Sequence, residues 1–209
     1  DGEGPVNQIT SSSPTYIGFE LEIVGRAAHA GVEPEKGLSA IRVAAEIIAR
    51  LPQGRIDEET TFNVGNISGG SVRNTVPENT SIIGEFRSRS LESLDALQGQ
   101  IAEAVTEAEH LFPEAKIETH LHTEFETYSL NEDDLATKRV TTTLRGLGLQ
   151  PIMKASGGGT DGNVFRLNGI SAVVVGMADH GMHTVRESVV IPELMDTAHL
   201  CESLIRINA

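Results

Sequence analysis

The sequence contains very little cysteine, few aromatic residues and no tryptophan. Its 209 residues include a single cysteine, Cys201, and only 4% of them are Phe, Trp or Tyr. One cysteine cannot form an internal disulfide, which excludes a small secreted scaffold held together by such bonds. This usage is typical of a reducing compartment, so we expect a cytoplasmic location.

Positive charge is also scarce, and long hydrophobic runs are absent. The chain has 16 Lys and Arg against 30 Asp and Glu, a net charge of -14. Nucleic acids and anionic membranes are bound through basic faces, so neither is an expected partner. No apolar run approaches the roughly 20 residues of a membrane span, and no signal-peptide pattern is found. The hydrophobic content of 39% is typical of a soluble globular protein with one or two domains.

The chain opens at Asp1 rather than at a methionine. Its first residues, Asp-Gly-Glu-Gly-Pro, are typical of a loop, so the chain starts within a loop. We therefore expect this chain to be a piece of a longer polypeptide.

Strand and helix patterns alternate after a Ser/Pro-rich hinge at residues 11–14. Residues 16–24 place apolar side chains on one face at every second position, which indicates a strand buried on one side. The predicted elements are a strand at 16–24, a helix at 37–51, strands at 60–67 and 80–88, a helix at 91–111 and a strand at 115–125. This β-α-β-β-α-β order is the ferredoxin-like pattern, an antiparallel sheet with both helices on one face.

From residue 128 the pattern changes to that of an α/β domain. The predicted elements are a helix at 132–147, a strand at 150–154, a glycine-rich loop, a short helix at 162–168, a buried strand at 171–175 and a closing helix from Pro192. Strands that alternate with helices predict a parallel or mixed sheet. The segment is short, so we expect only part of such a domain.

The glycine-rich loop formally satisfies the dinucleotide motif G-x-G-x-x-G through Gly157, Gly159 and Gly162. That motif requires a full βαβ unit and an acidic residue about 20 positions further on, and both are missing. Nucleotide binding is therefore disfavoured. Two interpretations stay open from the residues alone: close approach of the backbone to a ligand, or a tight turn in which Asp161 caps the next helix.

Three further residues are candidates for a functional site. His180 and His183 follow the apolar run, where open α/β sheets bind ligands, and histidine is the commonest metal ligand. Zinc is a natural candidate, and two exposed loop histidines are the alternative. Arg87 could hold a carboxylate in a bidentate fork or be an ordinary arginine at a strand end.

Another histidine, His29, lies among small residues, so it either sits in an exposed turn or leaves room for a ligand. The remaining histidines are interpreted as surface residues: His110, His120, His122 and His199.

Four motifs taken together resemble one family. They are Gly-Arg-Ala-Ala-His-Ala-Gly at 25–31, Asn-Thr-Val-Pro at 74–77, Ser-Gly-Gly-Gly-Thr-Asp-Gly at 156–162 and His-Thr-Val-Arg-Glu at 183–187. In this order and spacing they resemble the co-catalytic zinc peptidases, which include tripeptidase T, carboxypeptidase G and the aminoacylases. The likeness covers essentially the whole chain and is greatest to bacterial peptidase T-like proteins.

The resemblance implies a catalytic α/β domain interrupted by a smaller lid, or dimerisation, domain. Residues 1–13 would end the N-terminal catalytic segment, 14–127 would form the lid, and 128–209 would be the C-terminal part of the catalytic domain. It implies a homodimer formed through the lid and a hydrolase with two zinc ions, or cobalt or manganese, acting on short peptides. An N-acyl-amino-acid amidohydrolase and a non-catalytic dimerisation module are the alternatives.

The resemblance also implies individual roles. Asp1 and His183 would be metal ligands, whereas His180 does not fit the His-x-x-x-Glu pattern. His29 would reach the partner subunit's site and stabilise the tetrahedral intermediate. The positions that would hold the substrate are Asn74, Arg87, Gly158, Gly159 and Thr160.

Two departures from the family pattern limit what is implied. The His-x-Asp motif, the bridging aspartate and the Glu-Glu pair with the general base are not in this chain. We therefore expect the 209-residue chain to be inactive alone. Lys154-Ala155-Ser156 also stands where strict tripeptidases carry arginine, so the likeness does not extend to a strict tripeptide preference.

Overall fold

The computed structural model describes residues 2–206, and the chain divides into two compact units. The first, which we call the discontinuous unit, comprises the described parts of Asp1–Thr15 and Phe125–Ala209. The second, the inserted unit, is Tyr16–Glu124. Over the described residues, no helix combines the length and apolar character needed to cross a membrane.

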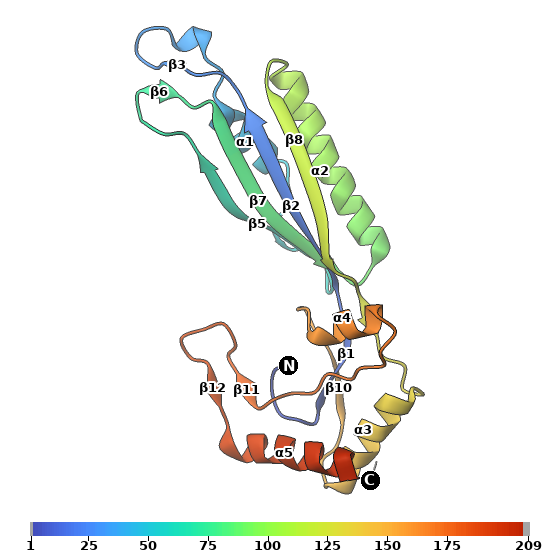
Figure 1. Cartoon of the computed structure of the whole chain (residues 1–209). Coiled ribbons are helices and arrows are strands. Elements are labelled where there is room, and N and C mark those ends of the chain that lie inside the picture. Colours follow the sequence, from blue (N-terminus) through green and yellow to red (C-terminus); the bar gives the residue numbers. More distant parts are fainter. Residues whose placement is uncertain (1, 207–209) are drawn as a thin grey trace. The chain divides into compact units, whose positions relative to one another are not determined.

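The inserted unit is built on a five-stranded sheet with two helices (Figure 1). The helices are α1 (Ala40–Ile48) and α2 (Leu91–Leu111). Across the sheet the strands are β4 (Gly54–Arg55), β5 (Thr61–Gly69), β7 (Asn79–Ser88), β2 (Thr15–Val24) and β8 (Lys116–Phe125). Apart from the two-residue β4, the element order is β-α-β-β-α-β, so the predicted ferredoxin-like pattern is confirmed.

A single hydrophobic core fixes both helices on the same face of this sheet. The rings of Phe19, Phe62 and Phe86, from β2, β5 and β7, lie at its centre with centroids 5.3 to 6.4 Å apart. Val43 on α1 and Ile101 on α2 belong to the same buried cluster. The apolar face of β2, predicted from its period-2 pattern, thus packs against the apolar faces of α1 and α2, as the sequence predicts.

Local signals in the sequence explain where the helices begin. The Ser39 hydroxyl accepts a hydrogen bond from the Arg42 N–H at 3.3 Å, and the Ser90 hydroxyl accepts one from the Ser93 N–H at 3.2 Å. Both serines are N-caps, the position where a side-chain oxygen satisfies an orphan donor of the first turn. The cap at Ser39 makes α1 begin after the predicted residue 37, and the helix ends at Ile48 instead of the predicted residue 51.

The discontinuous unit contains a small mixed sheet. Its central strand β1 (Gln8–Ser13) is parallel to β10 (Ile152–Ala155) and antiparallel to β9 (Tyr128–Ser129). The other elements are α3 (Leu135–Gly146), α4 (Asp161–Leu167), the β11 (Asp179–His180) and β12 (Ser188–Val189) pair, and α5 (Ile191–Arg206). The predicted mixed sheet with alternating helices is therefore present.

Two local predictions in this unit are wrong. The run 171–175 is not a regular strand, because its bridges go to separate partners: Val175 to Ile9 antiparallel, and neighbouring Gly176 to Gly2 parallel. No continuous ladder can build from two isolated bridges of opposite sense. The predicted hinge at residues 11–14 is in fact strand up to Ser13, because pairing with β9 and β10 outweighs the weak strand preference of serine.

Candidate functional site

The glycine-rich loop and His183 line one pocket of the discontinuous unit. The pocket has a volume of about 360 Å³. Thr10 of β1 and Lys154 of β10 contribute to its wall, and the segment 156–160 forms the rim nearest α4. The structure therefore brings four of the predicted site residues together, namely Gly158, Gly159, Thr160 and His183.

The loop presents bare backbone to its surroundings. Around Gly157 a Cβ would meet nothing within 4 Å, and around Gly158 only the Ser156 hydroxyl at 3.8 Å. Gly159 is different, because its Cβ would lie 2.2 Å from Cζ of the Phe125 ring. Glycine is thus required at position 159 by close packing, while Gly157 and Gly158 leave room for another molecule to approach.

Hydrogen bonds to side chains hold this loop in place. The Gly158 N–H donates to the Ser156 hydroxyl at 3.0 Å, and the Gly158 carbonyl accepts from the Ser13 hydroxyl at 3.0 Å. The Thr160 N–H donates to Oδ1 of Asn163 at 2.9 Å. The N–H groups of Gly158 and Thr160 are therefore engaged within the protein and are not free for a ligand.

Sequence reasoning did not identify Ser13 or Asn163. The Thr-x-x-Asn spacing of residues 160–163 is close to a capping-box pattern and could have drawn attention to Asn163. No local signal exists for Ser13, because it lies 145 positions from Gly158 in the sequence.

His183 is held by its own backbone conformation. Its φ is 63°, in the left-handed region, and its N–H donates to Oε2 of Glu187 at 2.9 Å. The His-x-x-x-Glu spacing thus corresponds to a physical contact between main chain and carboxylate. The His183 residue is exposed, which leaves its imidazole accessible at the pocket.

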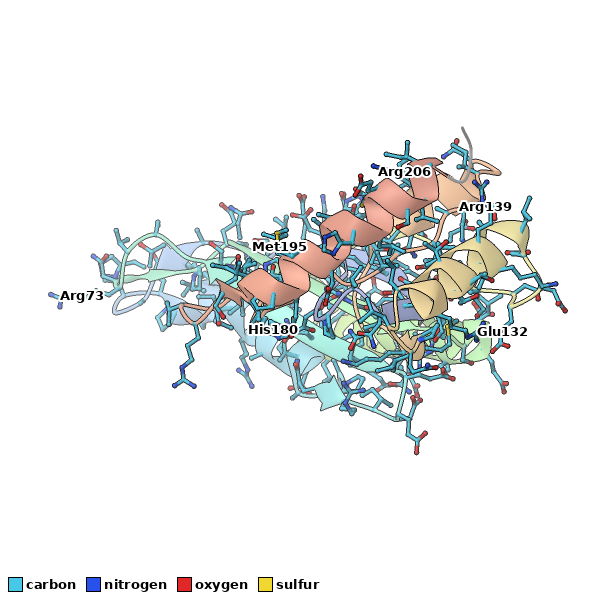
Figure 2. The ribbon with its side chains drawn as sticks, turned by 90° about the horizontal axis from the view of Figure 1, so that it is seen from below. Arg73, Glu132, Arg139, His180, Met195 and Arg206 are labelled. Carbon is cyan, nitrogen blue, oxygen red and sulfur yellow. The ribbon has the colours of Figure 1, made fainter. Side chains whose placement is uncertain are left out.

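His180 has a different environment. It lies on β11, and its Nε2 is 2.7 Å from Oε2 of Glu193 in the first turn of α5. Figure 2 shows His180 beside that end of α5. Because Glu193 engages its imidazole, we assign His180 a structural contact with α5.

The donors at the pocket form only part of a metal site. His183 and Glu3 both line it, and imidazole nitrogen with carboxylate oxygen is a donor set that zinc accepts. Within residues 2–206, however, no group of three His, Cys, Asp or Glu side chains could hold an ion. The other predicted ligand, Asp1, lies outside the described residues.

In the inserted unit, His29 and Asn74 are neighbours. The two-residue strands β3 (Ala28–His29) and β6 (Thr75–Val76) pair antiparallel, with His29 opposite Thr75. The Ala30 N–H donates to the Asn74 carbonyl at 2.9 Å. Both residues are exposed, so this hairpin-like pairing presents two of the predicted site residues to solvent.

Arg87 lies on β7 of the five-stranded sheet, whereas His29 belongs to the separate β3–β6 pair. It is near the end of β7, whose first residue is Asn79, and eight residues of strand span roughly 27 Å. Its Nε donates to Oε2 of Glu85 at 2.6 Å, and its guanidinium lies 4.5 Å from the centroid of the Tyr16 ring. The inserted unit by itself therefore does not bring Arg87 together with His29 and Asn74.

One buried titratable group, Tyr128, lies next to Gly162, just after the glycine loop. Tyr128 on β9 is only 9% exposed, and a Cβ on Gly162 would lie 3.2 Å from its hydroxyl. Burial raises the pKa of Tyr128 because the phenolate is poorly solvated there, while the Thr160 hydroxyl and the Arg166 guanidinium act in the opposite direction.

Comparison with known proteins places this geometry in a family. Residues 12–111 match the model of the peptidase dimerisation domain. YqjE of Bacillus subtilis, an uncharacterised protein, is 34% identical over 98% of this chain and 55% of its own length. The chain spans about half the length of the curated relatives it matches.

Solved structures give the same answer. The aminopeptidase PepT of Bacillus cereus superposes with a TM-score of 0.84 at 33% identity, over 98% of this chain and 55% of that protein. A tripeptidase of Staphylococcus aureus superposes with a TM-score of 0.88 at 30% identity, over 99% and 55%.

The fold alone is shared with the YxeP protein of Bacillus subtilis, a dinuclear metal-binding peptidase of the M20 family. Its TM-score is 0.68 at 16% identity, over 98% of this chain and 54% of that one. Residues 12–111 therefore form a dimerisation domain of the M20 peptidase type, and the chain as a whole is similar to the peptidase T-like proteins.

Proposed function

We propose that the protein containing this chain is a metal-dependent exopeptidase of the peptidase T type that hydrolyses short peptides in the cytoplasm. One observation carries the proposal: His183 and the loop 158–160 are separated in sequence by α4 and the segment after it, yet they line the same pocket. A metal ligand beside open backbone suits metal-dependent peptide hydrolysis, in which the scissile carbonyl must lie near the metal.

The metal of this site would be held in part by His183 and by Asp1. When bound, a pair of zinc ions, or of cobalt or manganese, would polarise the scissile carbonyl and lower the pKa of a shared water. Residues of the chain would bind and position the substrate. The open space beside Gly158 would admit the substrate closely, and Gly159 and Thr160 line the same wall of the pocket.

Residues of the inserted unit would also take part in substrate binding in the assembled protein. His29 is exposed, and its Nδ1 accepts a hydrogen bond from the Gly31 N–H at 3.2 Å, so its Nε2 would be the atom that stabilises an oxyanion in the partner subunit's site of a homodimer. Asn74 lies beside it and would hold the substrate. Arg87 would bind a substrate carboxylate, in exchange for its present contact with Glu85.

In this proposal residues 14–127 are the lid, and residues 1–13 with 128–209 belong to the catalytic domain. The remaining metal ligands and the general base would come from elsewhere in a longer protein. The 209-residue chain alone is then expected to hydrolyse no peptide. Zinc-dependent hydrolysis by the purified chain would overturn that expectation.

Subunit complementation tests the proposal most directly. In the full-length protein, His29→Ala and His183→Ala are each expected to abolish activity. When both proteins are mixed and allowed to exchange subunits, half of the dimers pair the two variants, and one of their two sites has both histidines. About a quarter of wild-type activity should return if the dimer is two-fold symmetric. Absence of recovery after demonstrated exchange would show that His29 does not act across the interface.

A substrate panel separates the remaining alternatives. Di- and tripeptides are compared with N-acyl amino acids, using the metal-loaded full-length protein. Preferential cleavage of acyl amino acids would make the protein an amidohydrolase of the same family. No cleavage of either class by a dimeric protein would favour a non-catalytic dimerisation module.

A further inference from the structure

Asn163 is the most highly connected buried polar side chain near the pocket. It is only 3% exposed, on the first turn of α4. Its Oδ1 accepts from the Thr160 N–H at 2.9 Å and lies 3.0 Å from the Ser13 hydroxyl. Its Nδ2 donates to the Glu126 carbonyl at 2.7 Å. The amide thus contacts three segments, and two of them, at Ser13 and Glu126, are remote from it in sequence.

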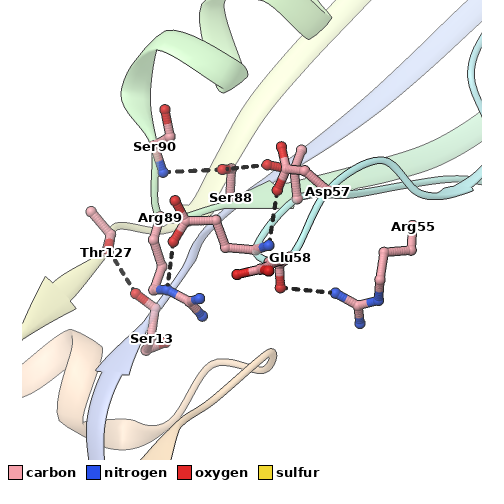
Figure 3. Close-up of polar contacts among 10 residues, drawn as sticks. Ser13, Arg55, Asp57, Glu58, Ser88, Arg89, Ser90 and Thr127 are labelled. Atoms are coloured by element: carbon pink, nitrogen blue, oxygen red, sulfur yellow. Dashed lines mark hydrogen bonds and ion pairs between the residues drawn. The ribbon is translucent and has the colours of Figure 1, made fainter.

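Those segments have distinct positions along the chain. Ser13 is the last residue of β1, just before the chain passes into the inserted unit, and Glu126 follows the point where it returns. The two crossing segments are also bonded to each other, since the Thr127 hydroxyl donates to the Ser13 carbonyl at 2.6 Å (Figure 3). The Thr127 N–H donates to the Thr15 hydroxyl at 2.9 Å.

The third segment is the glycine loop. Thr160 is bonded directly to Asn163, and the Ser13 hydroxyl lies 3.0 Å from both Asn163 Oδ1 and the Gly158 carbonyl. A hydroxyl has one proton and donates to one acceptor at a time. Ser13 and Asn163 therefore hold the two ends of the 158–160 segment.

A helix cap alone would explain only part of this arrangement. Capping α4 needs the Asn163 contact to the Thr160 N–H. It does not need a bond to the Glu126 carbonyl 37 positions away, nor burial of the amide against Ser13. A buried polar group that satisfies several partners at once fixes their mutual positions, because each unmade bond would cost free energy.

We propose that Asn163, with Ser13, is a positioning residue for substrate binding: it fixes the 158–160 backbone against the two crossing segments. Asn163 does not touch the substrate. It acts through the loop, and the inference rests on the proposed role of that loop in holding the peptide. Its loss should weaken the binding of substrate and transition state alike, which raises KM and leaves kcat nearly unchanged.

The test uses the full-length metal-loaded protein with Asn163→Ala and Ser13→Ala. Asn168→Ala is the matched control, because Asn168 ends the same helix but its exposed amide bonds only locally, to the Val164 carbonyl. We expect Asn163→Ala to raise KM about tenfold and to speed amide exchange at Thr160 by about tenfold or more. Ser13→Ala should act in the same direction and more weakly, and Asn168→Ala should change neither.

Each outcome decides the matter. Unchanged exchange across 157–160 in both variants would overturn the proposal, as would a fall in kcat at constant KM, which indicates loss of folded enzyme only. If Asn163→Ala unfolds the protein, Ser13→Ala decides, since it removes a single hydroxyl. If the wild-type protein cleaves no peptide, the proposed function fails. The amide-exchange measurement still shows in that case whether Asn163 holds the loop.

Discussion

The backbone N–H of His183 is bonded to the carboxylate of Glu187, with 2.9 Å between donor and acceptor. His183 has a φ of 63°, a conformation that costs a residue with a side chain about 1 kcal/mol or more. The hydrogen bond to Glu187 offsets this cost and fixes the orientation of the His183 backbone. The His-x-x-x-Glu motif therefore has a structural basis that does not depend on a metal.

Removal of this carboxylate should weaken metal binding without unfolding the protein. In the full-length protein we expect Glu187→Ala to lower zinc affinity about 10- to 100-fold, because an outer residue that orients a ligand is lost. Glu187→Gln is the control, since its amide oxygen still accepts from the His183 N–H. Competition with a coloured chelator measures both. Equal affinities in Glu187→Ala and wild type would contradict the role assigned to this bond.

Two of the loop glycines, Gly157 and Gly159, should differ in their tolerance of a side chain. At Gly159 an added Cβ would lie 2.2 Å from the Phe125 ring, so Gly159→Ala should cost about 1–3 kcal/mol of unfolding free energy. At Gly157 nothing lies within 4 Å and φ is not positive, so Gly157→Ala should be neutral or stabilising by up to about 1 kcal/mol. Chemical denaturation compares the two. Equal effects would show that the packing against Phe125 is not what requires glycine.

The aromatic cluster should dominate the stability of the inserted unit. Phe62 is 1% exposed and stacks on Phe86 with an interplanar angle of 9°. Phe62→Ala should lower the unfolding free energy by about 3–5 kcal/mol, because the cavity cannot close between two other rings. Leu91→Ala is the control: Leu91 is 66% exposed, and a surface change is expected to stay within about 0.5 kcal/mol.

Burial of Tyr128 should make stability depend on pH in the alkaline range. Its pKa is raised above the ordinary value by desolvation, so the unfolded chain loses this proton first as pH rises. The folded state then holds more protons than the unfolded state, and stability falls as pH passes from about 10 up through the raised pKa. The contribution is fully present at lower pH.

The variant Tyr128→Phe isolates this effect. Its unfolding free energy should fall less than that of the wild type between pH 9 and pH 11, measured by urea denaturation across that range. A parallel decline in both proteins would mean that other groups, such as the lysines, account for the alkaline loss.

The sequence predicted the inserted unit well because its signals are local. The strand at 16–24 and the helix at 91–111 correspond to β2 and α2, since period-2 and helical patterns meet in one core. The prediction for 171–175 was wrong for a different reason. Its apolar run marks burial, but a strand also needs a continuous partner, and Val175 and Gly176 bridge to residues from separate places.

The same distinction applies to the candidate site. The residues of one loop, from Gly158 to Thr160, and the motif at 183–187 could be recognised from sequence, because their chemistry is carried by short runs. Whether Asn74 and Arg87 bind substrate stays a prediction. Ser13 could not be recognised, because its contact with Gly158 crosses 145 positions and no local pattern encodes it.

By itself, then, the amino-acid sequence determined the element order of the inserted unit, the acidic character of the chain and the motifs of a peptidase family. Only the tertiary structure decided that His180 is bound to Glu193 while His183 is exposed at the pocket. It also decided that the buried amide of Asn163 joins the glycine loop to two segments remote in sequence, at Ser13 and Glu126. The reason is that periodicity is a property of neighbouring residues, whereas a buried polar group is satisfied by whichever segments the fold places around it.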